Sequence, residues 1–255
     1  MIRYREYLPH AGLSAYVACL WTSKVDMQAG RCTHHVLPDN CVDILWQDQA
    51  ARSFVVGMMT SSLHVHTQTR LQTIAVRFKP GGAAHFFGVP LSELTDRHIS
   101  LEDLWGSDVA EKLSDSLWSR PMTDRERLMG LERHLLQHLR RRKTAGSSRL
   151  VSTAVSAIES SNGLLKIEAL SASLGVSRQY LATQFHHHVG LSPKMLARIC
   201  RFQHTISDIR HGAPGKIDWA ELAANHGYYD QSHLIHEIHE FSDGTPEQLA
   251  AELHR

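Results

Sequence analysis

The chain has 255 residues, of which 42% are hydrophobic and 21% charged, and its formal net charge is +1. No apolar run approaches the roughly 18 residues of a membrane span, and the N-terminus lacks the apolar core of a signal peptide. Four cysteines lie without paired spacing, and a chain of this length does not need disulfide bonds. We therefore expect a cytoplasmic protein with one large or two ordinary domains.

The first 80 or so residues have the pattern of β-strands. Four stretches are rich in β-branched and aromatic residues, and they are separated by Gly, Pro, Asp-Asn and Ser-Ser. They are residues 15–25, 32–46, 53–59 and 71–80. "LPDN" breaks the second stretch into two strands around a turn. We predict a β-rich small barrel or sandwich.

The pattern changes to helical after "KPGGAAHFFGVP". Two short helical segments are followed by a longer one at 124–143, in which leucines recur at helical spacing. "KTAGSS" (143–148) is typical of a linker, and the remainder is helical throughout. We expect an α+β chain of two domains: a β-rich sensing or dimerisation domain with trailing helices at 1–143, a linker at 144–148, and an all-helical domain at 149–255. Helices are predicted at 149–161, 166–174, 177–188, 193–210, 217–225 and 230–241.

The helical part contains a weak internal repeat. "KIEALSASLGVSRQYLATQF" and "IDWAELAANHGYYDQSHLIHEI" each join two helices through a turn that contains glycine. When the copies are aligned on their N-caps, Ser177 and Asp230, apolar residues follow four and eight positions later in both. Two helices with a tight turn and an amphipathic second helix indicate a helix-turn-helix unit.

These stretches resemble the DNA-binding domain of the AraC/XylS family, which has two helix-turn-helix units joined by one long helix. "LSASLGVSRQYLATQFHHHVGLSP" matches the first unit, "LAANHGYYDQSHLIHEIHEF" the second, and "MLARICRFQHTI" the joining helix. "VLPDNCVDILW", "VVG" and "IAVRFKPGGAAHFFGVPLSELTDRHISLEDLWG" resemble an uncharacterised β-rich domain that precedes such domains in one bacterial subgroup. The resemblance implies a sequence-specific transcription regulator with no catalytic step. It also implies double-stranded DNA and RNA polymerase as partners.

The chain departs from the family pattern in its second unit. His236 and His239 stand where arginine or lysine is usual, and Ile238 stands where phenylalanine is usual. Asp243 replaces a common glycine and Leu249 a common tyrosine. These changes predict a weaker contribution of the second unit to DNA affinity, without a change of fold.

Helical geometry predicts which residues face DNA. Because the residues at cap+4 and cap+8 are buried, those at cap+1, +2, +5 and +6 turn outward. Glutamine suits adenine edges, and an apolar side chain can contact a thymine methyl. The expected DNA-contacting residues are Arg178, Gln179, Ala182, Thr183 and His186 in the first unit, and Gln231, Ser232, Ile235, His236 and His239 in the second. The joining helix carries a stripe of basic residues, Lys194, Arg198 and Arg201. The sequence allows these side chains either to contact DNA phosphates or to form ion pairs within the protein.

The helical half carries little formal positive charge. Residues 147–255 contain 9 Lys and Arg against 11 Asp and Glu, a net of −2, and ten histidines. A polyanion favours a basic surface. We therefore hypothesise that histidines supply positive charge conditionally, with DNA affinity rising as the pH falls from about 8 to 6.

The N-terminal half offers weaker candidates. Trp46, His34, His64 and His66 could line an effector pocket if the strands close around one, and a solid dimerisation domain is the alternative. A cupin-like barrel could hold a metal through three pairs of residues: Cys32 with His34, His64 with His66, and Cys41 with Asp43. None of these pairs has a diagnostic spacing. We expect no metal and no cofactor. A protein-interaction adaptor that has lost DNA binding is the other alternative, and a small-molecule effector and a homodimer stay open.

Overall fold

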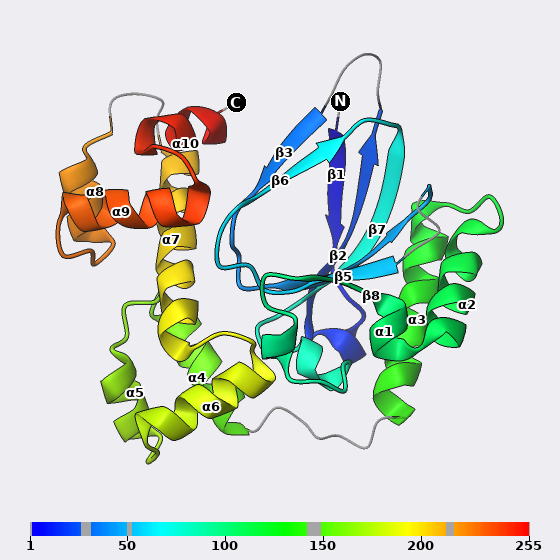
Figure 1. Cartoon of the computed structure of the whole chain (residues 1–255), viewed down its shortest axis with the longest axis horizontal. Helices are drawn as coiled ribbons and strands as arrows, with labels where there is room; N and C mark the ends of the chain where they lie inside the picture. The colour runs from blue at the N-terminus through cyan, green and yellow to red at the C-terminus, as the bar shows by residue number, and fades with distance from the viewer. Residues whose placement is uncertain (1, 27–31, 50–52, 142–148, 213–216, 255) are drawn as a thin grey trace.

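The structure is a computed structural model of the chain, and it describes residues 2–26, 32–49, 53–141, 149–212 and 217–254. β-strands fill its first part and α-helices its last part (Figure 1). The predicted order, a β-rich region with trailing helices followed by an all-helical region, is therefore confirmed. The linker predicted at 144–148 lies outside the described residues. No helix in the described ranges has the length and apolar character needed to cross a membrane.

The larger sheet has six antiparallel strands in the order β1-β2-β7-β4-β5-β8. It is an open sheet, because β1 and β8 at its edges pair with no further strand in the described residues. Its strands are β1 (Ile2–Tyr7), β2 (Val17–Val25), β4 (Val42–Gln47), β5 (Ser53–Val56), β7 (Leu71–Phe78) and β8 (His98–Ser100). A separate antiparallel pair is formed by β3 (Cys32–Val36) and β6 (Leu63–Thr67).

Alternation along the central strands explains which face of the large sheet is buried. In β4, Val42, Ile44 and Trp46 point into the core and are almost fully buried, while the residues between them are half-buried. Three short helices follow the sheet: α1 (Leu101–Trp105), α2 (Ser107–Trp118) and α3 (Asp124–Arg141). α3 contacts β7 and α1 contacts β5, so these helices cover one side of the sheet (Figure 1).

The helical part begins at α4 (Arg149–Ser160), which packs against α6 and α7. The following helices are α5 (Ile167–Ser173), α6 (Arg178–His188), α7 (Pro193–His211), α8 (Trp219–Asn225), α9 (Gln231–Ser242) and α10 (Pro246–Leu253). α7 is the long joining helix that the sequence predicts. α10 is an additional helix, which begins with a capping box at Thr245 and Gln248.

The two parts of the chain share one core. Buried apolar residues form a contiguous cluster that extends from Trp46 in the large sheet to Phe241 in α9. Polar contacts cross the same boundary. Asn40 Nδ2 donates a 3.2 Å hydrogen bond to the carbonyl of Leu196 in α7, and Thr95 Oγ1 donates a 2.7 Å bond to the carbonyl of Gly190. The β-rich part therefore contacts the segment that joins α6 to α7.

Candidate nucleic-acid interface

The first helix-turn-helix unit consists of α5 and α6. Its turn contains Gly175, whose φ of +67° lies in the left-handed region that glycine adopts without strain. Ser177 caps α6, since its Oγ accepts a 3.1 Å hydrogen bond from the backbone N–H three residues later. Leu181 and Phe185 are completely buried. The other face of α6 is thereby presented away from the core.

The second unit, α8 and α9, repeats this arrangement. Gly227 also has a φ of +67°, and Asp230 caps α9 by accepting a 2.8 Å hydrogen bond from the backbone N–H three residues later. Leu234 and Ile238 are completely buried, at the same distances from the cap as in the first unit. The repeat that the sequence indicates is thus also a repeat of backbone geometry, capping and burial.

α7 separates the two recognition helices. Figure 1 shows α6 beside the start of α7, and α9 crossing α7 farther along. With 19 residues, α7 is roughly 28 Å long at about 1.5 Å per residue. One chain therefore holds two recognition helices on a common rigid element.

The structure places all the residues expected to contact DNA on these helices. The exposed ones are Arg178, Gln179, Thr183 and His186 on α6, Gln231, Ser232, His236 and His239 on α9, and Lys194 at the start of α7. Ala182 and Ile235 are half-buried beside them. Their accessibility is compatible with DNA contact, and their individual roles stay predictions.

Arg201 and Arg198 are the exceptions. Arg198 Nε lies 2.7 Å from Oε1 of Glu237 in α9, and Arg201 Nη2 lies 2.9 Å from the same oxygen. The Arg201 guanidinium also lies over the ring of Tyr228, 4.6 Å from its centre. In this arrangement Arg201 pairs within the protein, because the carboxylate of Glu237 is only 1% exposed and needs a positive partner. This pairing favours the second of the two roles that the sequence leaves open for Arg201, and a phosphate contact stays a prediction.

Arg198 has a second acidic partner. Its guanidinium also donates hydrogen bonds to the carboxylate of Glu240, and these bonds lower the pKa of Glu240. His236 lies one turn before Glu240, with Nε2 3.9 Å from a carboxylate oxygen, and its side chain is 79% exposed. The outer face of α9 therefore carries imidazoles rather than guanidinium groups.

Two exposed aromatic residues were missed by the sequence reasoning. Tyr180 in the first turn of α6 is 51% exposed, and Tyr229, directly before the cap of α9, is 92% exposed. Tyrosine hydroxyl groups often donate hydrogen bonds to DNA phosphates. Their positions close to the helix caps could have suggested this role.

The four residues expected to line an effector pocket do not come together in the described structure. Trp46 is completely buried in the large sheet. His34, His64 and His66 are exposed on the separate β3–β6 pair. Partial desolvation lowers the pKa of His34.

Two residues of the alternative metal site, Cys41 and Asp43, have other surroundings. Asp43 accepts hydrogen bonds from the Arg77 guanidinium at 3.0 and 3.1 Å and from the Trp21 indole at 3.2 Å. Cys41 is a free thiol whose pKa is raised well above its usual range by burial. Cys41 and Asp43 therefore belong to the ion-paired patch around Arg77 on the large sheet.

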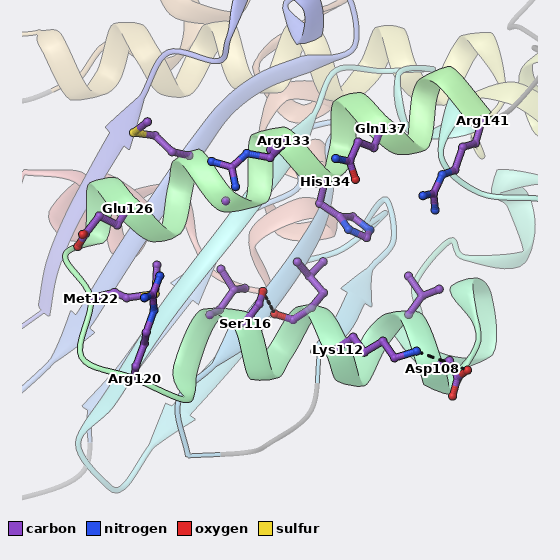
Figure 2. A pocket seen from close by; sticks show the side chains of 15 residues that line it. Asp108, Lys112, Ser116, Arg120, Met122, Glu126, Arg133, His134, Gln137 and Arg141 are labelled. Carbon is purple, nitrogen blue, oxygen red and sulfur yellow. Dashed lines mark hydrogen bonds and ion pairs between the residues drawn. The ribbon is translucent and has the colours of Figure 1, made fainter.

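A cleft lies between α2 and α3 (Figure 2). Its volume is about 740 Å³, which is within the range of small-molecule sites. Leu113, Leu117 and Met129 contribute apolar surface. Basic side chains outnumber acidic ones around it: Lys112, Arg120, Arg133 and Arg141 against Asp108 and Glu126.

Two family models match the chain. Residues 5–100 match a domain of unknown function (DUF6597), and residues 170–252 match a helix-turn-helix domain. No curated protein matches. The second model extends from the middle of α5 to α10 and so includes most of the first unit and all of the second.

Solved structures of ToxT from Vibrio cholerae resemble the chain at low identity. One, at 1.65 Å resolution, has a TM-score of 0.49 and 10% identity, covering 100% of this chain and 99% of that one. Another, bound to (E)-4-(8-methylnaphthalen-1-yl)but-3-enoic acid, has a TM-score of 0.47 and 9% identity, covering 99% of each chain. At these values no shared activity follows from the likeness.

Proposed function

We propose that the C-terminal part of this chain is an AraC-type DNA-binding domain of a transcription regulator, and that it places α6 and α9 in successive major-groove segments of one DNA site. The observation that carries the proposal is the matched geometry of the two units. Both have a left-handed glycine in the turn, a polar N-cap and buried residues at cap+4 and cap+8. A recognition helix of this kind contacts base edges through its N-terminal residues.

The length of α7 is of the same order as the spacing that this placement needs. Successive major-groove segments on one face of DNA are about 34 Å apart, and α7 is roughly 28 Å long. Because both helices belong to one chain, the site can be asymmetric and dimerisation is not required. Gln179 lies two residues after its cap and Gln231 one residue after its cap, both in the first turn, where glutamine can pair with adenine. We propose that RNA polymerase is the partner through which binding affects transcription.

We further propose that the β-rich part controls the DNA-binding part. Its contacts reach the end of the first unit and the helix that follows the second unit: the Thr95–Gly190 hydrogen bond lies beside the end of α6, and His35 Nδ1 lies 3.0 Å from Glu252 of α10. A change in the β-rich part could alter the relative placement of α6 and α9. The cleft between α2 and α3 is the candidate effector site, and its excess of basic side chains favours an anionic molecule.

The proposal is tested by selecting DNA from a random pool with the purified full-length chain. We expect one enriched sequence, and the Gln179→Ala plus Gln231→Ala variant should enrich it less. An adaptor that has lost DNA binding would enrich no sequence. Deleting residues 1–143 should leave a fragment that binds DNA but whose transcriptional output no longer responds to inducing conditions. A fragment with normal responses would exclude the β-rich part as the sensor.

A further inference from the structure

Two histidines and an aspartate meet where α7 and α8 are joined in space. His204 and Asp208 are four residues apart on α7, so they share one face of that helix. His226 is the C-cap of α8. One ligand atom from each of these three side chains lies within 4.8 Å of the other two. Within the described part of the chain, no other three His, Cys, Asp or Glu side chains meet this condition.

The contacts among them bring one nitrogen of each imidazole together. Nδ1 of His204 and Nδ1 of His226 are 2.9 Å apart, and Nε2 of His226 lies 3.1 Å from a carboxylate oxygen of Asp208. When Nε2 of His226 carries the proton and donates to Asp208, Nδ1 is a free acceptor that points at His204.

The spacing also fits a transition-metal ion. A tetrahedral ion that binds nitrogen at about 2.1 Å holds two ligands about 3.4 Å apart, so the two imidazole nitrogens, which lie 2.9 Å apart, need to separate by only about 0.5 Å. His226 is only 2% exposed and therefore held in place, whereas the Asp208 side chain is 57% exposed. The carboxylate can thus move to complete the ligand set, and water can reach the remaining positions.

We propose that His204, Asp208 and His226 bind one divalent transition-metal ion of the zinc class and thereby join α8 to α7. Two imidazoles and one carboxylate favour zinc, cobalt or nickel over magnesium or calcium, which prefer oxygen ligands. This inference goes beyond DNA binding, because the site can hold the ion whether or not DNA is present.

The position of the site gives the ion a structural role. His226 is followed directly by Gly227 and Tyr228 of the turn that leads into α9. Tyr228 is already held against α7, since its hydroxyl lies 3.4 Å from that of Thr205. A bound ion would add a second attachment one residue before the turn, and would fix the second recognition helix more firmly to the joining helix.

Titration of the full-length protein with Co²⁺ and Zn²⁺ tests the proposal. We expect one Co²⁺ per chain with visible ligand-field absorption, displaced by Zn²⁺, and a Zn²⁺-dependent rise in melting temperature. His204→Gln and Asp208→Asn should each weaken Zn²⁺ binding at least tenfold and remove the rise in melting temperature. Asp208→Asn changes an exposed side chain, so it remains informative if His204→Gln fails to fold.

The matched control is His186→Gln, which removes an exposed histidine from α6. It should leave the affinity for Zn²⁺ and the Co²⁺ spectrum unchanged. The proposal is overturned if the wild-type chain binds no stoichiometric ion at micromolar concentrations. It is also overturned if binding persists undiminished in Asp208→Asn, or if His186→Gln weakens binding as much as His204→Gln does.

Discussion

Arg198 of α7 donates a hydrogen bond from Nε to Oε1 of Glu237 in α9, at 2.7 Å. Arg201 donates to the same oxygen at 2.9 Å, so one buried carboxylate ties the second recognition helix to two arginines of the joining helix. Two of the 9 basic residues in 147–255 are thereby used inside the protein. The positive charge that faces DNA must come from residues such as Arg178 and Lys194.

Removing this carboxylate should destabilise the second unit. Glu237→Ala leaves two partly buried guanidinium groups without their shared partner, and losing one member of a buried ion pair typically costs about 3–5 kcal/mol. Glu240→Ala is the matched control, because the Glu240 side chain is 37% exposed and such pairs contribute about 1 kcal/mol or less. Thermal unfolding measures both variants. Equal decreases in melting temperature in the two variants would contradict a structural role for Glu237.

Base contact by the first unit should depend on Gln179. Gln179→Ala is expected to relax the base preference in one half of the site, at a cost of about 1–3 kcal/mol against the preferred sequence. Arg178→Ala, if its side chain binds phosphate, should weaken all sequences alike and lower the dependence of affinity on salt. Binding assays with selected and random DNA distinguish the two effects. Equal loss on both DNAs for Gln179→Ala would remove Gln179 from the base-contacting set.

His85, in the β-rich part, and His188, at the end of α6, should make the folded chain less stable in acid. Burial lowers the pKa of His85, and burial, with a smaller contribution from His187 and His85, lowers the pKa of His188. Because the folded state favours the neutral imidazoles, their stabilising contribution is complete above about pH 6.5, the value in an unfolded chain. It is lost as the pH falls through the lowered values, where the unfolded state binds more protons.

Melting temperatures measured from pH 8 to pH 5 test this expectation. The wild-type chain should lose stability below about pH 6.5. His85→Gln plus His188→Gln should show a smaller loss over the same interval, since two groups that must be protonated on unfolding are gone. The same pH dependence in both proteins would show that these histidines do not contribute.

The end of α9 should tolerate glycine better than alanine. Asp243 ends this helix with a φ of +51°, in the left-handed region. In this region an L-residue other than Asp or Asn destabilises the fold by roughly 1–2 kcal/mol, and glycine does not. Asp243→Gly should therefore melt at or above the wild-type temperature and Asp243→Ala below it. The reverse order would contradict the backbone strain inferred at this position.

The repeat, and with it the helical part, could be predicted from the sequence because its signals are local. The caps Ser177 and Asp230 and the buried residues after them are separated by fixed intervals along one chain. α6 was predicted at 177–188 and lies at Arg178–His188, and α9 was predicted at 230–241 and lies at Gln231–Ser242. The family pattern has glycine where this chain has Asp243, and α9 nevertheless ends there.

Strands β1, β6 and β8 were not predicted, for related physical reasons. β1 is exposed along most of its length and charged, so it lacks the apolar alternation of a half-buried strand. β6 is short and carries two histidines, and β8 has only three residues. Their pairing partners are distant in sequence. The open six-stranded sheet therefore follows from tertiary pairing rather than from local pattern.

The side-chain partners also required the structure. Arg201 and Glu237 are 36 positions apart, and no spacing rule predicts that they meet. His204 and His226 face each other from different helices. Trp46 has an apolar, alternating neighbourhood that suits a core residue as well as a pocket residue, and only the structure shows that it is buried. The hypothesis that histidines supply charge for DNA binding stays a prediction.

Chemical interference on the selected DNA site tests the central claim most directly. Guanines and adenines are methylated before the full-length chain is bound, and the bases whose methylation blocks binding are then identified. Two helices in successive major-groove segments predict two blocks of interference, with centres about 10 base pairs apart on one face of the DNA. Gln231→Ala should weaken only one block and Gln179→Ala only the other. A single block, or interference that neither variant changes, would contradict the account.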